Sequence, residues 1–262
     1  MVVARKRVEV PGEAAEPADE SAIVTRTVSL VSPRGAFGGF LALPSLPSKA
    51  AWKSAVVVIG QHPEVDLQVV QVARRLADAG HGALAIGQRA LALRSPASLD
   101  VTLDVDAALA YVRTEASGRA PRFAVVGYGP GGFTALVAGY RSQVGAAIAF
   151  YGEGPKRLHA ELAQILDRPK RHAAALLFLL GGDDEAVQPT AVAAIRERLQ
   201  RFGMQHSFII YPRMNDGFAH PGHGAYRALE ANESWGRLLV ALEGARRLRN
   251  RTPPRRAPRA SS

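Results

Sequence analysis

The regular alternation of short apolar runs with helix-patterned segments is the feature that most limits how this chain can fold. Residues 55–59 form a continuous apolar run of mainly β-branched residues, which is typical of a strand buried on both faces. Val69, Val72 and Leu76 follow at helical spacing, and Gly80 stands where the end of a helix is expected. The alternation continues with strand-like runs at residues 83–86, 123–126, 146–151, 174–180 and 207–211.

Two further runs open the series. Residues 28–31 and 40–43 flank the turn signal Ser32-Pro33-Arg34-Gly35 and predict a hairpin. Eight strands alternating with helices predict an α/β fold class: a single domain with an about eight-stranded, mostly parallel sheet and helices on both faces. The 262 residues suit one such domain, expected at 22–245, with a flexible N-terminal tail at 1–21 and a basic, disordered C-terminal tail at 246–262.

The formal net charge of +10 is unevenly distributed along the chain. Residues 245–262 carry seven arginines and no acid, whereas residues 1–21 carry three basic and five acidic groups. The body is therefore only mildly basic, and the tail alone suits phosphate contacts with a nucleic acid. The longest apolar run, residues 173–180, is far shorter than the roughly 20 residues of a membrane helix. No signal peptide or cysteine is present in the sequence, and we expect a cytoplasmic protein without a membrane partner.

A glycine-dense turn follows the strand-like run at 123–126 and leads directly into a helical pattern. One chemistry that uses this arrangement is dinucleotide binding. Gly127, Gly129 and Gly132 fit its G-x-G-x-x-G pattern, and Glu153 ends the next strand, where a ribose-binding acid is expected. Against it, several strands precede the turn, and Pro130 removes one amide that could face a pyrophosphate.

The second chemistry is the nucleophile elbow, G-x-[S/C]-x-G, which presents a nucleophile on a sharp strand-to-helix turn. Gly127 and Gly131 supply the small flanking residues that such a turn requires. Residue 129, at the nucleophile position, is glycine. The sequence therefore predicts the elbow without its nucleophile.

Four ordered blocks resemble the dienelactone hydrolase family (carboxymethylenebutenolidases) of the α/β-hydrolase superfamily, from about Val24 to Glu243. The first is the strand at 56–59 with the loop and helix up to Gly80. The second, Val126-Gly-Tyr-Gly-Pro-Gly-Gly132, resembles the family's V-G-Y-C-x-G-G elbow and is followed by Ala149-Phe-Tyr-Gly152. The others are the acid loop Leu180-Gly-Gly-Asp-Asp184 and the segment Asp216-Gly-Phe-Ala-His-Pro221, which resembles the His-Gly-Phe loop. The resemblance implies an α/β-hydrolase-like domain.

The family uses a Cys-His-Asp triad, and the resemblance places this triad on three positions here. The nucleophile position is Gly129, the acid position is Asp184 with Asp183 as an alternative register, and the general-base position is Asp216. A carboxylate with an ordinary pKa near 4 is a far poorer base than an imidazole near 6.5. The family's His-Glu pair reads Gly60-Gln61, so its active-site glutamate is also replaced. Only the acid position retains its family residue.

Other side chains near the same cleft offer alternatives. His62 follows the first central strand and is a candidate base, and His220 lies four residues beyond the base position. His220 and His223 form a weak metal pair because proline and glycine break any helix between them. Asp184 and Asp216 facing each other could share a proton or hold a hard cation.

These observations predict a catalytically impaired or inactive homologue that retains a ligand pocket for a small molecule. The pocket candidates are Gln61, His62, Tyr128, Pro130 and His220, and neither a cofactor nor a metal is expected. Two alternatives stay open: an active hydrolase of an ester, lactone or related substrate with a rearranged site, and nucleic-acid association through the arginine-rich tail. The oligomeric state is not predicted.

Overall fold

The centre of the sheet consists of strands with no polar residue on either face. In the computed structural model, β3 (Ala55–Ile59), β4 (Gly82–Ile86) and β6 (Ala146–Phe150) are buried at every position, as expected for strands covered on both sides. The structure describes residues 23–47, 50–89, 99–141, 144–151 and 174–249. Parallel pairing joins these strands to β5 (Phe123–Tyr128), β7 (Ala175–Gly181) and β8 (His206–Tyr211).

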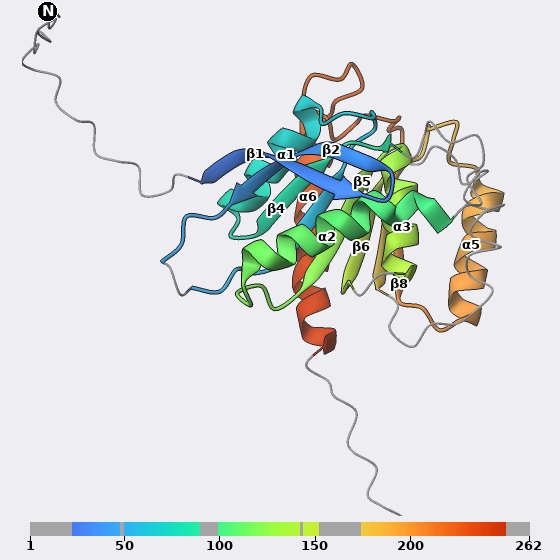
Figure 1. The fold of residues 1–262 in the computed structure, drawn as a ribbon. Helices are drawn as coiled ribbons and strands as arrows, with labels where there is room; N and C mark the ends of the chain where they lie inside the picture. The colour runs from blue at the N-terminus through green and yellow to red at the C-terminus, as the bar shows by residue number, and fades with distance from the viewer. Residues whose placement is uncertain (1–22, 48–49, 90–98, 142–143, 152–173, 250–262) are drawn as a thin grey trace, which may run out of the picture.

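The opening hairpin completes the sheet. β1 (Val24–Ser32) pairs antiparallel with β2 (Gly35–Leu43), and β2 pairs antiparallel with β4. The eight strands lie in the order β1-β2-β4-β3-β5-β6-β7-β8 (Figure 1). This arrangement confirms the predicted mostly parallel sheet entered by an antiparallel hairpin.

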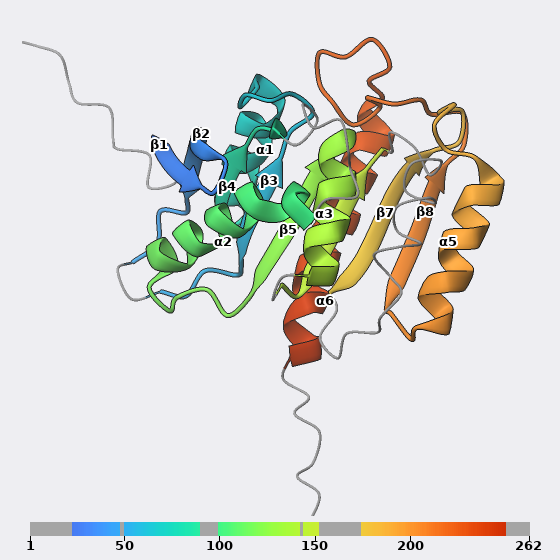
Figure 2. The same cartoon turned by 45° about the vertical axis from the view of Figure 1, so that its right-hand side comes forward.

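Helices cover both faces, which divides the core into two clusters. α1 (Leu67–Asp78) and α6 (Ala228–Arg249) lie on one face, where Leu76 and Leu238 join Val58 in one buried cluster. On the other face are α2 (Leu103–Ala116), preceded by the short helix η2 (Leu99–Thr102), α3 (Pro130–Arg141) and α5 (Pro189–Arg201). Figure 2 shows α2 and α3 in front of the sheet and α6 behind it.

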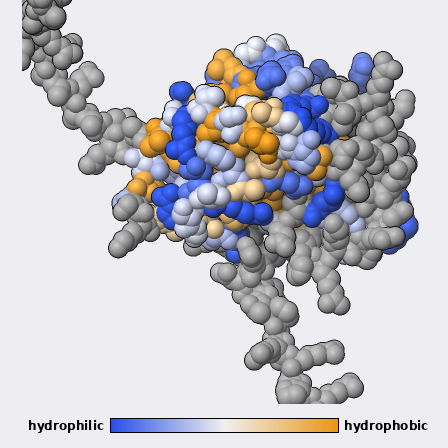
Figure 3. All heavy atoms as spheres, viewed as in Figure 1, coloured by the Kyte–Doolittle hydropathy of each residue, from blue (hydrophilic) through white to orange (hydrophobic). Residues whose placement is uncertain are grey.

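The two expected tails fall almost wholly outside the described residues. α6 continues to Arg249, four residues beyond the expected domain boundary at 245. Glu153, the candidate ribose-binding acid, also lies outside the described ranges. The face of the molecule seen in Figure 3 mixes hydrophilic and hydrophobic residues. Within the described ranges, no helix combines the length and the apolar character needed to cross a bilayer.

Candidate functional site

The turn between β5 and α3 has the tight geometry that its glycines predict. Gly129 adopts a left-handed backbone conformation with φ +51°, and its N–H donates to the Phe150 carbonyl at 3.0 Å. A Cβ at Gly127 would lie 2.0 Å from the carbonyl oxygen of Gly131, and one at Gly131 would lie 2.4 Å from that of Gly60. Only glycine fits at 127 and 131 without moving the backbone, so the elbow frame is intact.

The space beside Gly129 is filled by the side chain of Gln61. A Cβ built on Gly129 would lie 2.9 Å from the Gln61 Oε1 and 3.3 Å from its Cγ. The Gln61 Nε2 donates to the Oε1 of Gln68 at 3.0 Å, and Gln68 is buried within α1. Where the family's elbow presents a sulfur, this chain therefore holds an amide that is tethered from a neighbouring helix.

Asp66 fixes the start of α1 close to the elbow. Its Oδ1 accepts a hydrogen bond from the backbone N–H of Val69 at 3.0 Å, which is the N-cap interaction of the helix. Since Asp66 caps the helix that carries Gln68, it also helps to hold the Gln61–Gln68 pair in place.

Asp184, which the sequence predicts at the acid position, accepts hydrogen bonds from its own loop. Its Oδ1 accepts from the Ala186 N–H at 2.9 Å, and its carbonyl oxygen accepts from the Val187 N–H at 2.8 Å. These bonds form a side-chain-stabilised turn between β7 and α5. The neighbouring Asp183 is exposed, and its N–H donates to the Met214 carbonyl at 3.0 Å.

Asp216, predicted at the general-base position, is exposed on the loop that follows β8. The next residue, Gly217, has φ +80° and packs so closely that a Cβ there would lie 2.2 Å from the Nδ1 of His223. His223 is thus held against the backbone next to the base position. Among the described residues, no group of three or more histidine, cysteine or acidic side chains could hold a metal ion.

His220 lies on the loop after β8, four residues beyond Asp216. It is half-buried, and its backbone N–H donates to the Gly217 carbonyl at 2.9 Å. Burial lowers the pKa of His220, and the charge of His223 adds to this, while the carboxylates of Asp66 and Asp216 oppose it. The Nδ1 of His220 is buried and finds no hydrogen-bond partner among the described residues. Burial thus disfavours the charged form of this imidazole, which lies on the loop after β8 and is affected by Asp66 from the loop after β3.

Of the other residues predicted to line a pocket, some are exposed and some are packed in the protein. His62 is exposed, and its carbonyl oxygen accepts from the Gln88 N–H at 2.6 Å. Pro130 begins α3 and has no N–H to offer an oxyanion. Tyr128 is buried and stacks on Phe150 with 4.7 Å between ring centroids, and burial raises its pKa above the ordinary value.

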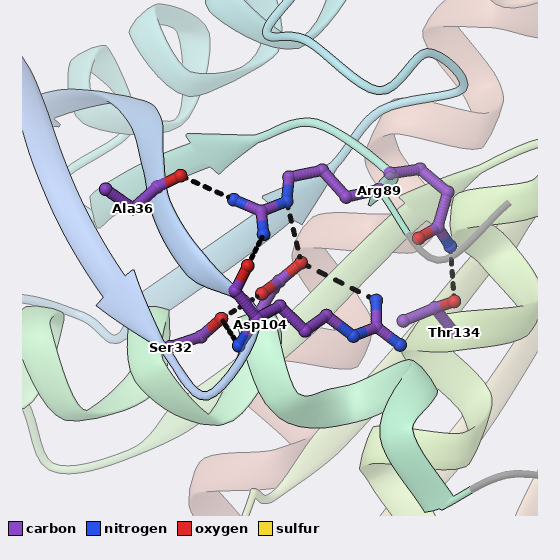
Figure 4. Close-up of polar contacts among 7 residues, drawn as sticks. Ser32, Ala36, Arg89, Asp104 and Thr134 are labelled. Atoms are coloured by element: carbon purple, nitrogen blue, oxygen red, sulfur yellow. Dashed lines mark hydrogen bonds and ion pairs between the residues drawn. The ribbon is translucent and has the colours of Figure 1, made fainter. Parts of the chain in front are cut away.

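Polar groups that sequence reasoning did not identify lie behind the elbow. Gln88 donates to the Oγ1 of Thr134 and to the Pro130 carbonyl, the latter at 3.3 Å. Arg89, the next residue, pairs through Nε with the Oδ2 of Asp104 at 3.4 Å, as Figure 4 shows. The buried Asp104 also accepts from the Oγ of Ser32 at 2.5 Å. The loop after β4 thus connects the elbow helix to the β1–β2 hairpin. In the sequence, the one indication of this network is that Asp104 stands next to the apolar positions of α2.

A pocket of about 450 Å³, its open mouth included, lies between α1 and α6. Tyr128 and Phe150, at the carboxyl ends of β5 and β6, line it together with Gln68 of α1 and Trp235 of α6. Of the five pocket candidates chosen from the sequence, Tyr128 alone is in its wall. Gln68 joins this pocket to the elbow because its Oε1 receives the Gln61 bond.

Comparisons with known proteins agree with this architecture. The model of the dienelactone hydrolase family matches residues 85–244. A protein of Bradyrhizobium sp named as a probable 2-oxo-3-(5-oxofuran-2-ylidene)propanoate lactonase is 29% identical over 144 residues, which cover 54% of this chain and 58% of that protein. A protein of Escherichia coli strain K12, assigned by name to the carboxymethylenebutenolidases, is 30% identical over 125 residues, 47% of this chain and 46% of the relative. The alignments thus span about half the length of these curated relatives.

The fold has a close match among solved structures. The dienelactone-hydrolase-like promiscuous phosphotriesterase from metagenomic libraries superimposes with a TM-score of 0.67 at 21% identity. The match covers 86% of this chain and 99% of that one. The likeness therefore extends over nearly the whole of a single hydrolase-like domain.

Proposed function

This chain belongs to the dienelactone hydrolase family, and from that premise we propose that it is a member without covalent hydrolase activity that binds a small molecule. One observation carries the proposal: the amide of Gln61 lies 2.9 Å from where a nucleophile's Cβ would stand on Gly129. The proposal includes a cytoplasmic location and a small molecule, rather than a membrane or a nucleic acid, as the partner.

The chemistry at the other triad positions supports the same proposal. Covalent acyl transfer needs an activated nucleophile, and losing one in a hydrolase triad costs on the order of 10⁶-fold in rate. Asp216 offers an exposed carboxylate where the family has an imidazole. Pro130 cannot supply the backbone N–H that the residue after the nucleophile normally gives to the oxyanion. Nucleophile, base and one oxyanion donor are lost together.

Hydrolysis of 4-nitrophenyl acetate tests this proposal. We expect the wild-type protein to release 4-nitrophenolate no faster than buffer. Gly129→Cys with Asp216→His restores the two reactive groups, and Gln61→Ala clears the space that the new Cβ needs. A gain by this triple variant supports the proposal, because it shows that the ester reaches the cleft. A burst of 4-nitrophenolate stoichiometric with wild-type protein would overturn it.

A rearranged hydrolase is the second candidate, and the position of His220 favours it. Its half-buried imidazole has a buried Nδ1 without a hydrogen-bond partner among the described residues, and burial lowers its pKa, so in its uncharged form it could take a proton from water. Under this alternative the wild-type protein turns over an ester without a burst, and His220→Ala abolishes that turnover. His223→Ala is the matched control and should leave the turnover unchanged.

A further inference from the structure

The pocket between α1 and α6 has an apolar wall with a few polar groups at defined places. Val72 of α1, Phe150 at the end of β6 and Trp235 of α6 supply apolar surface around the pocket. Ala219 and Pro221 of the loop after β8 also line it. A mostly apolar wall with a few placed polar groups is typical of sites that bind small organic molecules.

One buried polar group in the wall lacks a partner. Gln68 is 4% exposed, and its Nε2 finds no hydrogen-bond acceptor in the described part of the chain. Tyr128 is 3% exposed and lines the same pocket. Burying a donor without an acceptor is energetically unfavourable, so such groups normally have a partner. Both side chains line the pocket, and a ligand oxygen would supply the acceptor.

The charge of the lining is positive. The guanidinium of Arg75 lies over the Trp235 ring at 4.1 Å from its centroid, and both residues line the pocket. No acidic side chain is among the described residues that line it. The stacked arginine is held in place, and a guanidinium binds a carboxylate through two parallel hydrogen bonds.

From these contacts we infer that the α1–α6 pocket binds a small carboxylic acid with an apolar, ring-sized body. The carboxylate would lie between Arg75 and the amide of Gln68, and the ring would lie against Phe150 and Trp235. This site differs from the cleft beside Gly129, because α1 and α6 line it and Gln61, which fills the space at Gly129, is not among its lining residues. The inference deepens the proposed binding role and rests on it.

Titration calorimetry with phenylacetate and its neutral amide, phenylacetamide, tests the inference. We expect phenylacetate to bind the full-length protein about tenfold more tightly than phenylacetamide. Arg75→Gln should remove this difference, and Tyr128→Phe should weaken both ligands. Arg74→Gln is the matched control: Arg74 is the neighbouring exposed arginine on α1 and lies over Phe40 rather than in the pocket.

Tryptophan fluorescence locates the binding. The chain has two tryptophans, of which Trp235 lines the pocket and Trp52 is buried elsewhere in the core. Phenylacetate should change the emission of wild-type protein but not of Trp235→Phe. Absence of binding, equal affinity for the amide, or an equal loss in Arg74→Gln would overturn the inference. Ester turnover by the wild type would instead overturn the proposed function and leave these titrations unchanged.

Discussion

Gln61 and Gln68 are joined side chain to side chain at 3.0 Å, so the loop after β3 is tied to the buried face of α1. The bond holds the Gln61 amide against Gly129 instead of leaving it free to turn into solvent. The backbone at residue 129 has a φ of +51°, which glycine adopts without strain. Residue 129 is thus under both a steric and a conformational constraint.

Adding a side chain at residue 129 should destabilise the fold through both constraints. We expect Gly129→Ala to lower the free energy of unfolding by about 2 kcal/mol, part from the left-handed backbone and part from the contact with Gln61. In a Gln61→Ala background the same change should cost less, because the steric part is gone. Urea unfolding of the four proteins in this double-mutant cycle measures the coupling. Strictly additive effects would contradict the placement of Gln61.

The buried carboxylate of Asp104 should contribute more to stability than an exposed acid. It is 4% exposed and receives Ser32 and Arg89 as partners. We expect Asp104→Asn to lower the free energy of unfolding by about 2–4 kcal/mol, because it leaves a partly buried arginine without its counter-charge.

The surface pair Arg26–Glu115 provides the matched control for Asp104. Its side chains are 47% and 23% exposed, and Glu115→Gln should therefore cost less than about 1 kcal/mol. Thermal and urea unfolding of both variants compare the two. Equal losses would show that the Asp104 network does not hold the hairpin to α2.

The arrangement of strands was largely predictable because strands buried on both faces appear in the sequence as continuous apolar runs. Runs such as residues 55–59 contain no polar residue, and the parallel order of such strands follows from the intervening helices. The elbow was predictable for a similar reason, since Gly127 and Gly131 stand where any Cβ would collide with backbone.

The site was less predictable because its decisive contacts join residues that are distant in sequence. Nothing in the pattern around Gln61 shows that its side chain turns toward Gly129. The sequence likewise does not indicate that Gln68 is buried in α1. The stacking of Arg75 on Trp235 depends on how α1 and α6 lie side by side on one face of the sheet. For His220 the sequence shows only that it lies four residues beyond the predicted base position, whereas the influence of Asp66 on its pKa comes from the loop after β3.

Acid should destabilise the protein through His81. This residue is 2% exposed, and its Nδ1 lies 2.8 Å from the Oγ of Ser54. Burial, with a smaller effect of the charge of Lys53, lowers the pKa of His81 from 6.5 to about 4. Between these two values the unfolded chain binds the proton and the folded protein does not, so stability falls as the pH drops from about 6.5 to about 4.

The expected size of the His81 effect is about 2 kcal/mol between pH 7 and pH 5. Urea unfolding at the two pH values measures it, and in His81→Gln this part of the pH dependence should disappear. His223→Gln, a change at an exposed loop histidine, should leave most of the wild-type difference in place. An unchanged pH dependence in His81→Gln would contradict the assignment.

Two helical glycines should respond in opposite directions to alanine. Gly139 of α3 faces β6, and a Cβ there would lie 2.4 Å from the Cβ of Ala147. Gly139→Ala must push the helix away from the sheet, and we expect the free energy of unfolding to fall by about 1–3 kcal/mol.

Gly236 of α6 is exposed, and an added Cβ meets nothing within 4 Å among the described residues. Gly236→Ala should raise the free energy of unfolding by about 0.5–1 kcal/mol, because alanine loses less backbone entropy in a helix. Thermal unfolding of the pair checks both signs, and a stabilising Gly139→Ala would mean that α3 does not pack on β6 as closely as described.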